Sequence, residues 1–587
     1  MSGLRKVLVL VLLLTALLPT TAPVASQGGR GAIIEANPRG VEGLGSLNPL
    51  RCNRAACRRV TDFLFPWLLG VDPETKTFDG SGLTRSWETG ADGVITFALR
   101  EDLAWSDGTP ITAYDVFYSY LSLASREIRS PYSGRVAAAI TGAAPLDEHT
   151  IAFIYVDGVG CAALDYTQFP IIPAHVFEPE FAATAAAVFD GGDARADYTS
   201  WQEQQADRSF AWMRTHSFDQ YPTVTAGVFQ IDGIQPPDYV RLLTPDGDLG
   251  FAYVDLPENR TAVELFLQGE TNLLADPPFA RREDIRAADD VQVFEAPGRT
   301  WLAISLNLAD PWLPQGAVDD DGNPLDQGMH PVFGDVRVRR ALQLAMDVER
   351  QIEVVTQGNG TALATYNLPA FWGYDDDLLP VPFDPRAAEQ LLESAGWKDT
   401  NRDGIRECRG CLYAQEGARL SFDLAVPDST IYNVELLATQ IAQQAEDVGF
   451  MVTINSVDRG VATNVVRRQV YDAYMIEFTD GYPVNPDATL SALFSPAEDV
   501  LGYGLNFGSY NSPALDDVLA QARDLPGCDF AARAALYRQA QTILQDDQPY
   551  IWLFAPNEML VAQGAVTGFD PYPHAPFWNV AEWVVVR

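Results

Sequence analysis

Six cysteines are the most reactive side chains in this chain of 587 residues. Cys52 and Cys57 are five positions apart, and Cys408 and Cys411 are three apart. The second spacing also occurs in half of a zinc site, but neither a second close pair nor a histidine cluster accompanies it. We therefore favour two local disulfides, Cys52–Cys57 and Cys408–Cys411, over a metal site. Two further cysteines have no evident mates, namely Cys161 and Cys528.

The segment 399–404, Asp-Thr-Asn-Arg-Asp-Gly, has the acid spacing that begins a calcium-binding EF-hand loop. The twelfth position of such a loop supplies a bidentate glutamate, but Gly410 stands there. We interpret the segment as a structural turn, with weak calcium binding as the alternative.

The chain lacks the common motifs of hydrolytic enzymes: Gly-x-Ser-x-Gly, His-Glu-x-x-His and a phosphate-cradling glycine loop. Its five histidines are scattered without metal-ligand spacing. Carboxylate pairs of the kind that glycosidases use are too common in so acidic a chain to be assigned a catalytic role. The motifs therefore point to no cofactor and to no particular hydrolase, but they do not exclude a glycosidase that uses two carboxylates, so an exported hydrolase stays the alternative.

Acidic residues outnumber basic ones by 79 to 40, and the net charge is −39 at pH 7. Binding to nucleic acid or to anionic lipid requires clustered lysine and arginine side chains. The composition therefore argues against nucleic acid as a partner.

The first 26 residues have the order of a secretory signal peptide. Arg5 and Lys6 precede an uncharged apolar run, residues 7–18, and Val24 and Ser26 stand at the −3 and −1 positions of a cleavage site. The run is shorter than the roughly 20 residues that span a bilayer. No cysteine follows it that could carry a lipid anchor. We expect an exported protein, periplasmic or extracellular, at the outer face of the cytoplasmic membrane.

The remaining chain is too long for one hydrophobic core, so at least two lobes are expected. Residues 95–99 alternate as a half-buried strand, and Thr112 with Asp115 can cap the helix that follows. In the second half, helices near 385–395 and 433–447 alternate with strands near 420–426, 451–457 and 474–478. This alternation predicts an α/β fold with mixed, mostly parallel sheets, whose ligands bind beyond the carboxyl ends of the strands.

Several segments resemble, in the same order, the family 5 extracellular solute-binding proteins, the dipeptide-, oligopeptide- and nickel-binding group. The longest is Ile95–Val116, which is close to the signature block of that family. The others are Ser46–Pro49, Thr225–Phe229, Asp335–Leu342, Leu391–Trp397 and Trp578–Asn579. The resemblance covers nearly all of the chain after the signal peptide.

The resemblance implies a two-lobed periplasmic-binding-protein-like fold that closes on a ligand in the cleft between the lobes. Lobe I would comprise residues 27–303 and 554–587, and lobe II residues 304–553. The chain would cross between the lobes near 297–305 and near 551–556.

The resemblance also implies a set of ligand-binding residues. In peptide-binding members, an aspartate just after an aromatic residue holds the peptide ammonium, and Asp480 after Phe478 occupies that place one position early. Asp480-Gly481 is otherwise a favoured turn pair. The remaining candidates are Tyr482 in the same loop, Tyr132 after a proline, Asn53 in the loop beside Cys52, and Trp372 in a polar run.

The implied function is the capture of a peptide or similar small solute for an ABC importer, whose permease and ATPase subunits would be partners. Opines, nickel chelates and sugars are alternative ligands, and a ligand sensor on the same fold is an alternative role. We expect the protein to be a monomer.

Overall fold

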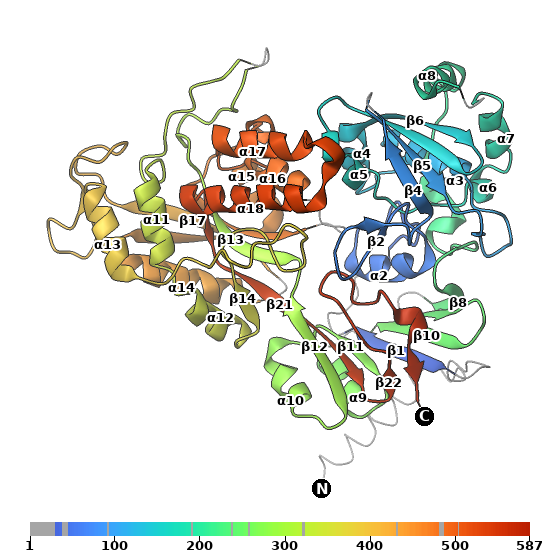
Figure 1. The fold of residues 1–587 in the computed structure, drawn as a ribbon. Helices are drawn as coiled ribbons and strands as arrows, with labels where there is room; N and C mark the ends of the chain where they lie inside the picture. The colour runs from blue at the N-terminus through green and yellow to red at the C-terminus, as the bar shows by residue number, and fades with distance from the viewer. Residues whose placement is uncertain are drawn as a thin grey trace, which may run out of the picture.

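The computed structural model arranges the chain in two lobes that lie side by side (Figure 1). It describes residues 30–37, 45–90, 93–189, 192–235, 239–255, 259–319, 323–429, 432–480, 486–502 and 504–586. The expected signal peptide and Tyr482 lie outside these ranges. Among the helices within them, none combines the length and the apolar character needed to cross a bilayer.

The first lobe contains two main sheets, besides the two-stranded sheets of β2 (Gly70–Val71) with β3 (Phe78–Asp79) and of β22 (Val566–Thr567) with β23 (Val584–Val585). The larger has eight strands in the order β12-β21-β11-β1-β10-β9-β8, and its eighth strand, β14, comes from the segment expected in the second lobe and pairs with the start of β21. Their bounds are β1 Gly31–Asn37, β8 Gln230–Gln235, β9 Tyr239–Leu243, β10 Leu249–Asp255, β11 Leu273–Ala275, β12 Val291–Pro297, β14 Gly360–Ala362 and β21 Phe554–Gln563. The smaller sheet has the order β4-β5-β7-β6, with β4 Thr84–Thr89, β5 Val94–Leu99, β6 Ile140–Asp147 and β7 Thr150–Tyr155.

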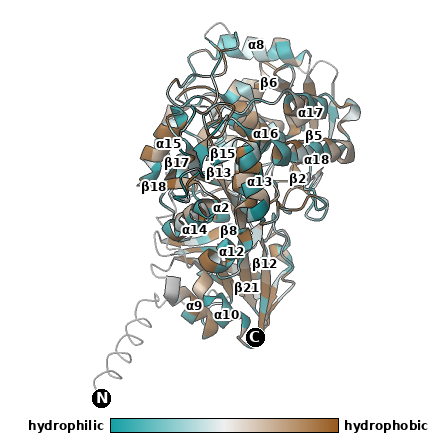
Figure 2. Ribbon diagram, turned by 90° about the vertical axis from the view of Figure 1, so that its left-hand side faces the viewer, coloured by the Kyte–Doolittle hydropathy of each residue, from teal (hydrophilic) through white to brown (hydrophobic). Residues whose placement is uncertain are grey.

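The second lobe is built on one five-stranded sheet in the order β18-β17-β19-β13-β20. Its strands are β13 Thr300–Leu306, β17 Ser421–Pro427, β18 Met451–Val457, β19 Ala473–Thr479 and β20 Tyr550–Trp552. The helices of this lobe include α13 Pro385–Ser394, α14 Val434–Glu446, α17 Pro513–Arg523 and α18 Phe530–Asp547. In Figure 2 the helices carry hydrophobic and hydrophilic residues side by side, as expected where one helix face packs on protein and the other meets water.

The α/β fold with mixed sheets is confirmed, but the expectation that parallel pairs would predominate is wrong. Each large sheet has only two parallel pairs, and both involve the same strand: β1 with β10 and β11 in the first sheet, and β17 with β18 and β19 in the second. The smaller sheet is antiparallel throughout. Hairpins such as β6–β7 and β8–β9 join adjacent strands, and the strands at the crossings, β13, β20 and β21, enter antiparallel to their neighbours.

Each lobe has its own hydrophobic core. One large cluster of buried side chains runs from Ile33 to Leu273 and resumes at Leu560. A second runs from Trp301 to Ala555. The chain passes between the two clusters where β12 leads to β13, and again within β21. The lobe boundaries near residues 303 and 553 stay predictions.

Local capping follows the sequence closely. Helix α3 (Ala113–Ala124) begins with a capping box made by Thr112 and Asp115. The Asp115 carboxylate accepts hydrogen bonds from the backbone N–H of Thr112 at 2.9 Å and from that of Ala174 at 2.8 Å. Asp115 is 4% exposed, so it also ties α3 to the segment at Ala174 inside the lobe.

Replacement of Asp115 by alanine should lower the free energy of unfolding by about 2–4 kcal/mol, because it leaves two buried backbone donors unsatisfied. Denaturant titration of the ligand-free protein would measure the loss. The matched control is Asp157→Ala, an exposed position whose replacement should change stability by less than about 0.5 kcal/mol. Equal effects of the two replacements would contradict this account.

Candidate functional site

Asp480 follows β19 at the point where the first crossing segment enters the second lobe. Its backbone N–H donates to the carbonyl oxygen of Arg299 at 3.0 Å. Its two carboxylate oxygens accept hydrogen bonds from Trp301 Nε1 at 2.9 Å and from Thr489 Oγ1 at 2.6 Å. The side chain is 2% exposed, and burial raises its pKa to about 6, although these two hydrogen bonds and Arg299 oppose the shift. The structure thus gives Asp480 a buried, bonded environment.

Phe478 is opposite Trp301 in the β13–β19 pair, and the two rings are 5.3 Å apart. Phe478 is only partly buried. The antiparallel register therefore places the expected aromatic residue beside the crossing segment.

Asp62 was not found by sequence reading. It lies on α2 (Ala55–Leu64) of the first lobe, and its side chain is exposed although the protein around it limits its hydration. Both observations hold for a group that projects into a cavity. This environment raises the pKa of Asp62 to about 6, and the positive charges of Arg58, Arg299 and Arg59 oppose the rise. Arg299 lowers the pKa of both Asp62 and Asp480, so both carboxylates lie near it. A lone aspartate in an ordinary helix gave no signal in the sequence.

A cavity of about 400 Å³ in the first lobe has Asp62 in its wall. Its wall exposes polar and apolar surface in equal amounts, and its polar members include Asp62, Arg100 and Gln168. The Nε2 atom of Gln168 is buried and has no hydrogen-bond partner within the described part of the chain. A cavity of this volume, with both apolar and polar groups in its wall, is typical of small-ligand pockets.

Tyr132, a predicted site residue, is 8% exposed and lies close to Asp62. Its ring makes an edge contact with Trp67 at 6.0 Å, and two guanidinium groups, those of Arg58 and Arg135, lie 5.8 and 5.7 Å from its centroid. Cation–π contacts of this kind hold the ring in place beside the charged groups.

The loop before α2 holds Asn53, whose side chain is exposed. The structure joins Cys52 to Cys57 across this loop, with 5.9 Å between their Cα atoms. The disulfide constrains both the loop and the first turn of the helix that carries Asp62. The structure likewise joins Cys408 to Cys411.

Trp372, the last predicted site residue, packs within the second lobe. Its ring lies 5.3 Å from the rings of both Phe530 and Tyr537, and the Arg533 guanidinium lies 5.2 Å from its centroid. The packing of the lobe accounts for these contacts, and Trp372 thereby supports Arg533.

A band of charged side chains connects these groups across the two lobes. Asp165 of the first lobe interacts with Arg135 and, at 3.9 Å, with Arg533 of the second. Burial raises the pKa of Asp165 to about 7, against the opposing effect of Arg533. Arg533 donates to the Tyr537 hydroxyl at 3.2 Å, and Asp487 accepts from Arg523 at 2.9 Å.

Many polar atoms in this band are buried yet have no hydrogen-bond partner among the described residues. They are Arg58 Nε, Ser133 Oγ, Arg135 Nε, Asp165 Oδ2, Gln168 Nε2, Tyr366 Oη, Asn367 Nδ2 and Arg533 Nε. Unsatisfied buried donors and acceptors are costly, so a polar ligand that reached these atoms would gain by satisfying them.

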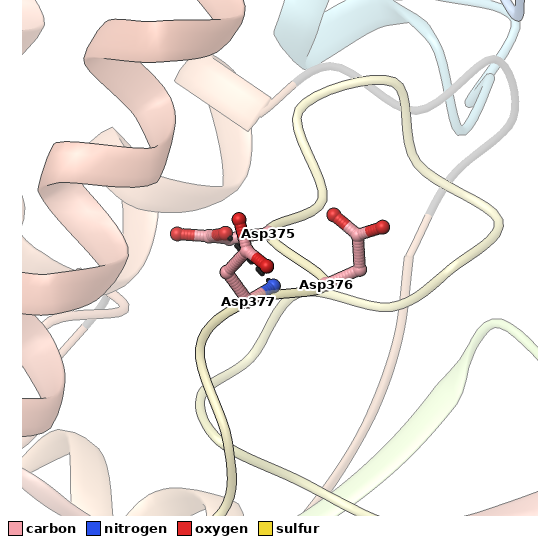
Figure 3. A group of neighbouring side chains, drawn as sticks. All are labelled: Asp375, Asp376 and Asp377. Carbon is pink, nitrogen blue, oxygen red and sulfur yellow. Dashed lines mark hydrogen bonds between the residues drawn. The ribbon is translucent and has the colours of Figure 1, made fainter.

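Two acidic groups elsewhere could be mistaken for metal sites. Asp375, Asp376 and Asp377 form a largely exposed group on one loop, with the Asp377 N–H donating to Asp375 (Figure 3). In the EF-hand-like segment, the carboxylate of Glu407 accepts hydrogen bonds from Thr400 and Asn401, while Asp399 accepts from two backbone N–H groups. Hydrogen bonds of this kind are typical of structural turns, and we assign no metal to either group.

The family model described as bacterial extracellular solute-binding proteins, family 5 Middle, matches residues 81–499. The chain belongs to this family. Its members bind solutes rather than catalyse reactions, and this chain is a solute-binding protein.

Known relatives extend over most of the chain. The dipeptide-binding protein of Escherichia coli (strain K12) is 24% identical over 520 residues, 85% of each chain. The oligopeptide-binding protein AppA of Bacillus subtilis (strain 168) is 25% identical over 258 residues, so the match spans 44% of this chain and 45% of that protein. The solved structure of AppA in complex with a nonapeptide covers 95% of this chain with a TM-score of 0.63 at 17% identity. This likeness shows the two-lobed fold.

The ligand-free protein should lose stability as the pH rises through about 6, because Asp480 is then ionised while buried. A carboxyl with a raised pKa contributes most to stability below its ordinary pKa of 3.8, and the contribution is lost as the pH passes the folded value of about 6. Asp480→Asn keeps the neutral shape, since the amide can accept from Trp301 and donate to Thr489. Its stability relative to the unmodified protein should therefore rise by about 2–3 kcal/mol between pH 4 and pH 7. Denaturant titrations across this range would measure it, and a difference independent of pH would contradict the assignment.

Proposed function

We propose that this protein is the exported peptide-binding component of an ABC importer. It captures a short peptide by closure of the two lobes and releases it to the permease, whose ATPase partners drive uptake. The observation that carries the proposal is the band of buried acidic and basic side chains that face one another from the two lobes. A peptide has an ammonium at one end, a carboxylate at the other and amide groups between them, so it can satisfy both signs of charge and the unpartnered polar atoms.

The ammonium end of the peptide lies, in this proposal, at Asp62 and Asp480. Asp62 contacts the ammonium because its side chain is accessible, and Asp480 contributes negative charge from beside Arg299. A charge-assisted hydrogen bond inside a closed cleft is strong and selects for a free amino terminus. The cavity beside Asp62 takes an apolar side chain of the peptide. Tyr132 lies close to Asp62, and Asn53, Phe478 and Tyr482, the last of which lies outside the described ranges, stay candidates for contact with the ligand.

The relatives support peptides over the other ligands. Both curated relatives described above are named for binding dipeptides or oligopeptides, and AppA was solved with a nonapeptide. The expected signal peptide and the disulfides Cys52–Cys57 and Cys408–Cys411 agree with an extracytoplasmic location. A sensor with the same ligand would bind it equally well but would not support uptake by cells.

A thermal-shift screen tests the ligand class directly. The mature chain would be heated with peptides of two to nine residues and, separately, with sugars, opines and nickel chelates. Saturation at 100 times Kd should stabilise the folded protein by about 2.7 kcal/mol. Stabilisation by a non-peptide solute alone would contradict the proposal.

The best peptide from the screen then tests the ammonium site by isothermal calorimetry. Asp62→Asn removes the charge but keeps the shape, so it should weaken binding by about 2–5 kcal/mol, roughly 30-fold to several-thousand-fold in Kd. Asp480→Asn should weaken it by roughly tenfold, through the loss of a more distant charge. N-acetylation of the peptide should weaken its binding to the unmodified protein as much as Asp62→Asn weakens the binding of the free peptide. Binding to the Asp62→Asn variant should be weakened far less by acetylation.

The matched control is Asp376→Asn, which removes a charge from an exposed loop and should leave Kd unchanged. If Asp480→Asn lowers the affinity for the peptide more than Asp62→Asn does, Asp480 and not Asp62 binds the ammonium. Equal binding by all variants would show that neither aspartate holds an ammonium.

A further inference from the structure

The two cysteines without evident mates form a disulfide between the lobes. Cys161 lies in a short turn of the first lobe, Gly160–Ala162, and Cys528 in the turn Pro526–Cys528 between α17 and α18. Their Cα atoms are 5.3 Å apart although 367 positions separate them in the chain. The other two disulfides each close a loop within one lobe.

The disulfide stands apart from the place where the chain crosses between the lobes. In Figure 1 the turn between α17 and α18 reaches the first lobe well above β21, at the other end of the region where the lobes meet. The lobes are therefore joined at two separated points, by the crossing segments at one and by a covalent bond at the other. Rotation about the crossing segments would have to pull Cys161 away from Cys528.

Close contacts surround this second junction. A Cβ atom at Gly160 would overlap the carbonyl oxygen of Arg523, so the backbones of the two lobes touch there. The rings of Phe78 and Phe530, one from each lobe, are 6.5 Å apart in an edge arrangement. The structure thus shows the lobes in the closed arrangement, in which the disulfide can form.

The charges beside the disulfide do not favour closure by themselves. The side chains of Asp165 and Arg533 are 4% and 3% exposed, but their nearest approach is 3.9 Å. Asp165 Oδ2 and Arg533 Nε have no hydrogen-bond partner among the described residues. An ion pair that is desolvated without good geometry tends to lose more hydration than it gains in attraction. Without a ligand, opening of the lobes would return these groups to water.

We propose that the Cys161–Cys528 disulfide is a redox-controlled lock that holds the lobes closed, and that its reduction by a dithiol permits them to open. While the disulfide is intact, the lobes cannot open. Once it is reduced, the poorly compensated charges of Asp165 and Arg533 favour the open arrangement. Ligand exchange would then depend on the redox state of the surroundings. This inference concerns the motion of the lobes and does not depend on which ligand they hold.

The reaction is a thiol–disulfide exchange with balanced electrons. One thiolate of the dithiol attacks the sulfur of Cys528, the bond to Cys161 breaks, and Cys161 leaves as a thiolate that takes up a proton. The second thiol of the reagent then displaces Cys528, which also becomes a thiol, and the reagent is left as a cyclic disulfide. Two electrons pass from the dithiol to the pair of cysteines.

Access favours this bond over the disulfide beside α2. Cys528 is partly exposed in a turn whose preceding residues, Pro526 and Gly527, are exposed. Cys52 and Cys57 are each 1% exposed. Thiolate attack requires access to a sulfur, so a mild dithiol should open Cys161–Cys528 before Cys52–Cys57.

Small-angle scattering of the ligand-free, oxidised mature chain tests the lock. Its radius of gyration should match that of the closed structure and should increase after dithiothreitol treatment that peptide mapping shows to have reduced Cys161 and Cys528. The double variant Cys161→Ser/Cys528→Ser should give the larger radius without any reductant.

The matched control is Cys52→Ser/Cys57→Ser, which removes a disulfide within one lobe and should keep the smaller radius until dithiothreitol is added. Circular dichroism checks that each variant is folded. If the Cys161→Ser/Cys528→Ser variant does not fold, the reduced unmodified protein provides the radius of gyration of the chain without this disulfide. Equal radii for oxidised and reduced protein would overturn the proposal. A small radius in protein whose Cys161 and Cys528 are shown by alkylation to be free thiols would overturn it as well. Since neither measurement uses a ligand, a negative result leaves the peptide assignment unaffected.

Discussion

Asp165 and Arg533 face each other from different lobes, and both side chains are almost completely buried. Charges in such surroundings need hydrogen bonds that water no longer provides, and here neither side chain has its full set among the described residues. The same condition recurs along the band that leads from Tyr132 to Asp480. Reduced hydration raises the pKa of Asp62, Asp165 and Asp480 alike. The closed arrangement of the lobes therefore requires an interaction that offsets the lost hydration of these charged groups.

Two compensating partners follow from the structure. A ligand with charges of both signs supplies the missing hydrogen bonds directly, which is the basis for proposing a peptide. The inter-lobe disulfide acts differently, because it holds the surfaces together without satisfying any of them. A protein with both devices can be closed in the absence of ligand, unlike a trap that closes only because the ligand contacts both lobes.

The β13–β19 pair and the disulfide-linked start of α2 hold the charged groups beside the segment where the chain crosses between the lobes. β13 and β19 run antiparallel, so that Trp301 and Phe478 are paired and the carboxylate of Asp480 reaches Trp301 Nε1. On the other side, the disulfide between Cys52 and Cys57 constrains the start of α2, and this helix carries Asp62. Both carboxylates approach Arg299, which lies in the crossing segment itself. A shift of one lobe against the other must therefore change the surroundings of all three residues.

The sequence by itself determined the local elements and the family. The caps at Thr112 and Asp384, the helix α14 and the strands β17 to β19 were predictable, because capping and hydrophobic periodicity depend on neighbours in the chain. The two local cysteine pairs were predictable for the same reason. Tertiary structure alone decided the rest. The pairing of Cys161 with Cys528 spans 367 positions, the antiparallel entry of β13 and β21 depends on the chain crossing twice between the lobes, and Asp62 becomes notable only when Arg299 and a cavity lie beside it. Contacts between residues so distant in the chain leave no periodic signal in the sequence, since each depends on how two separately folded lobes meet.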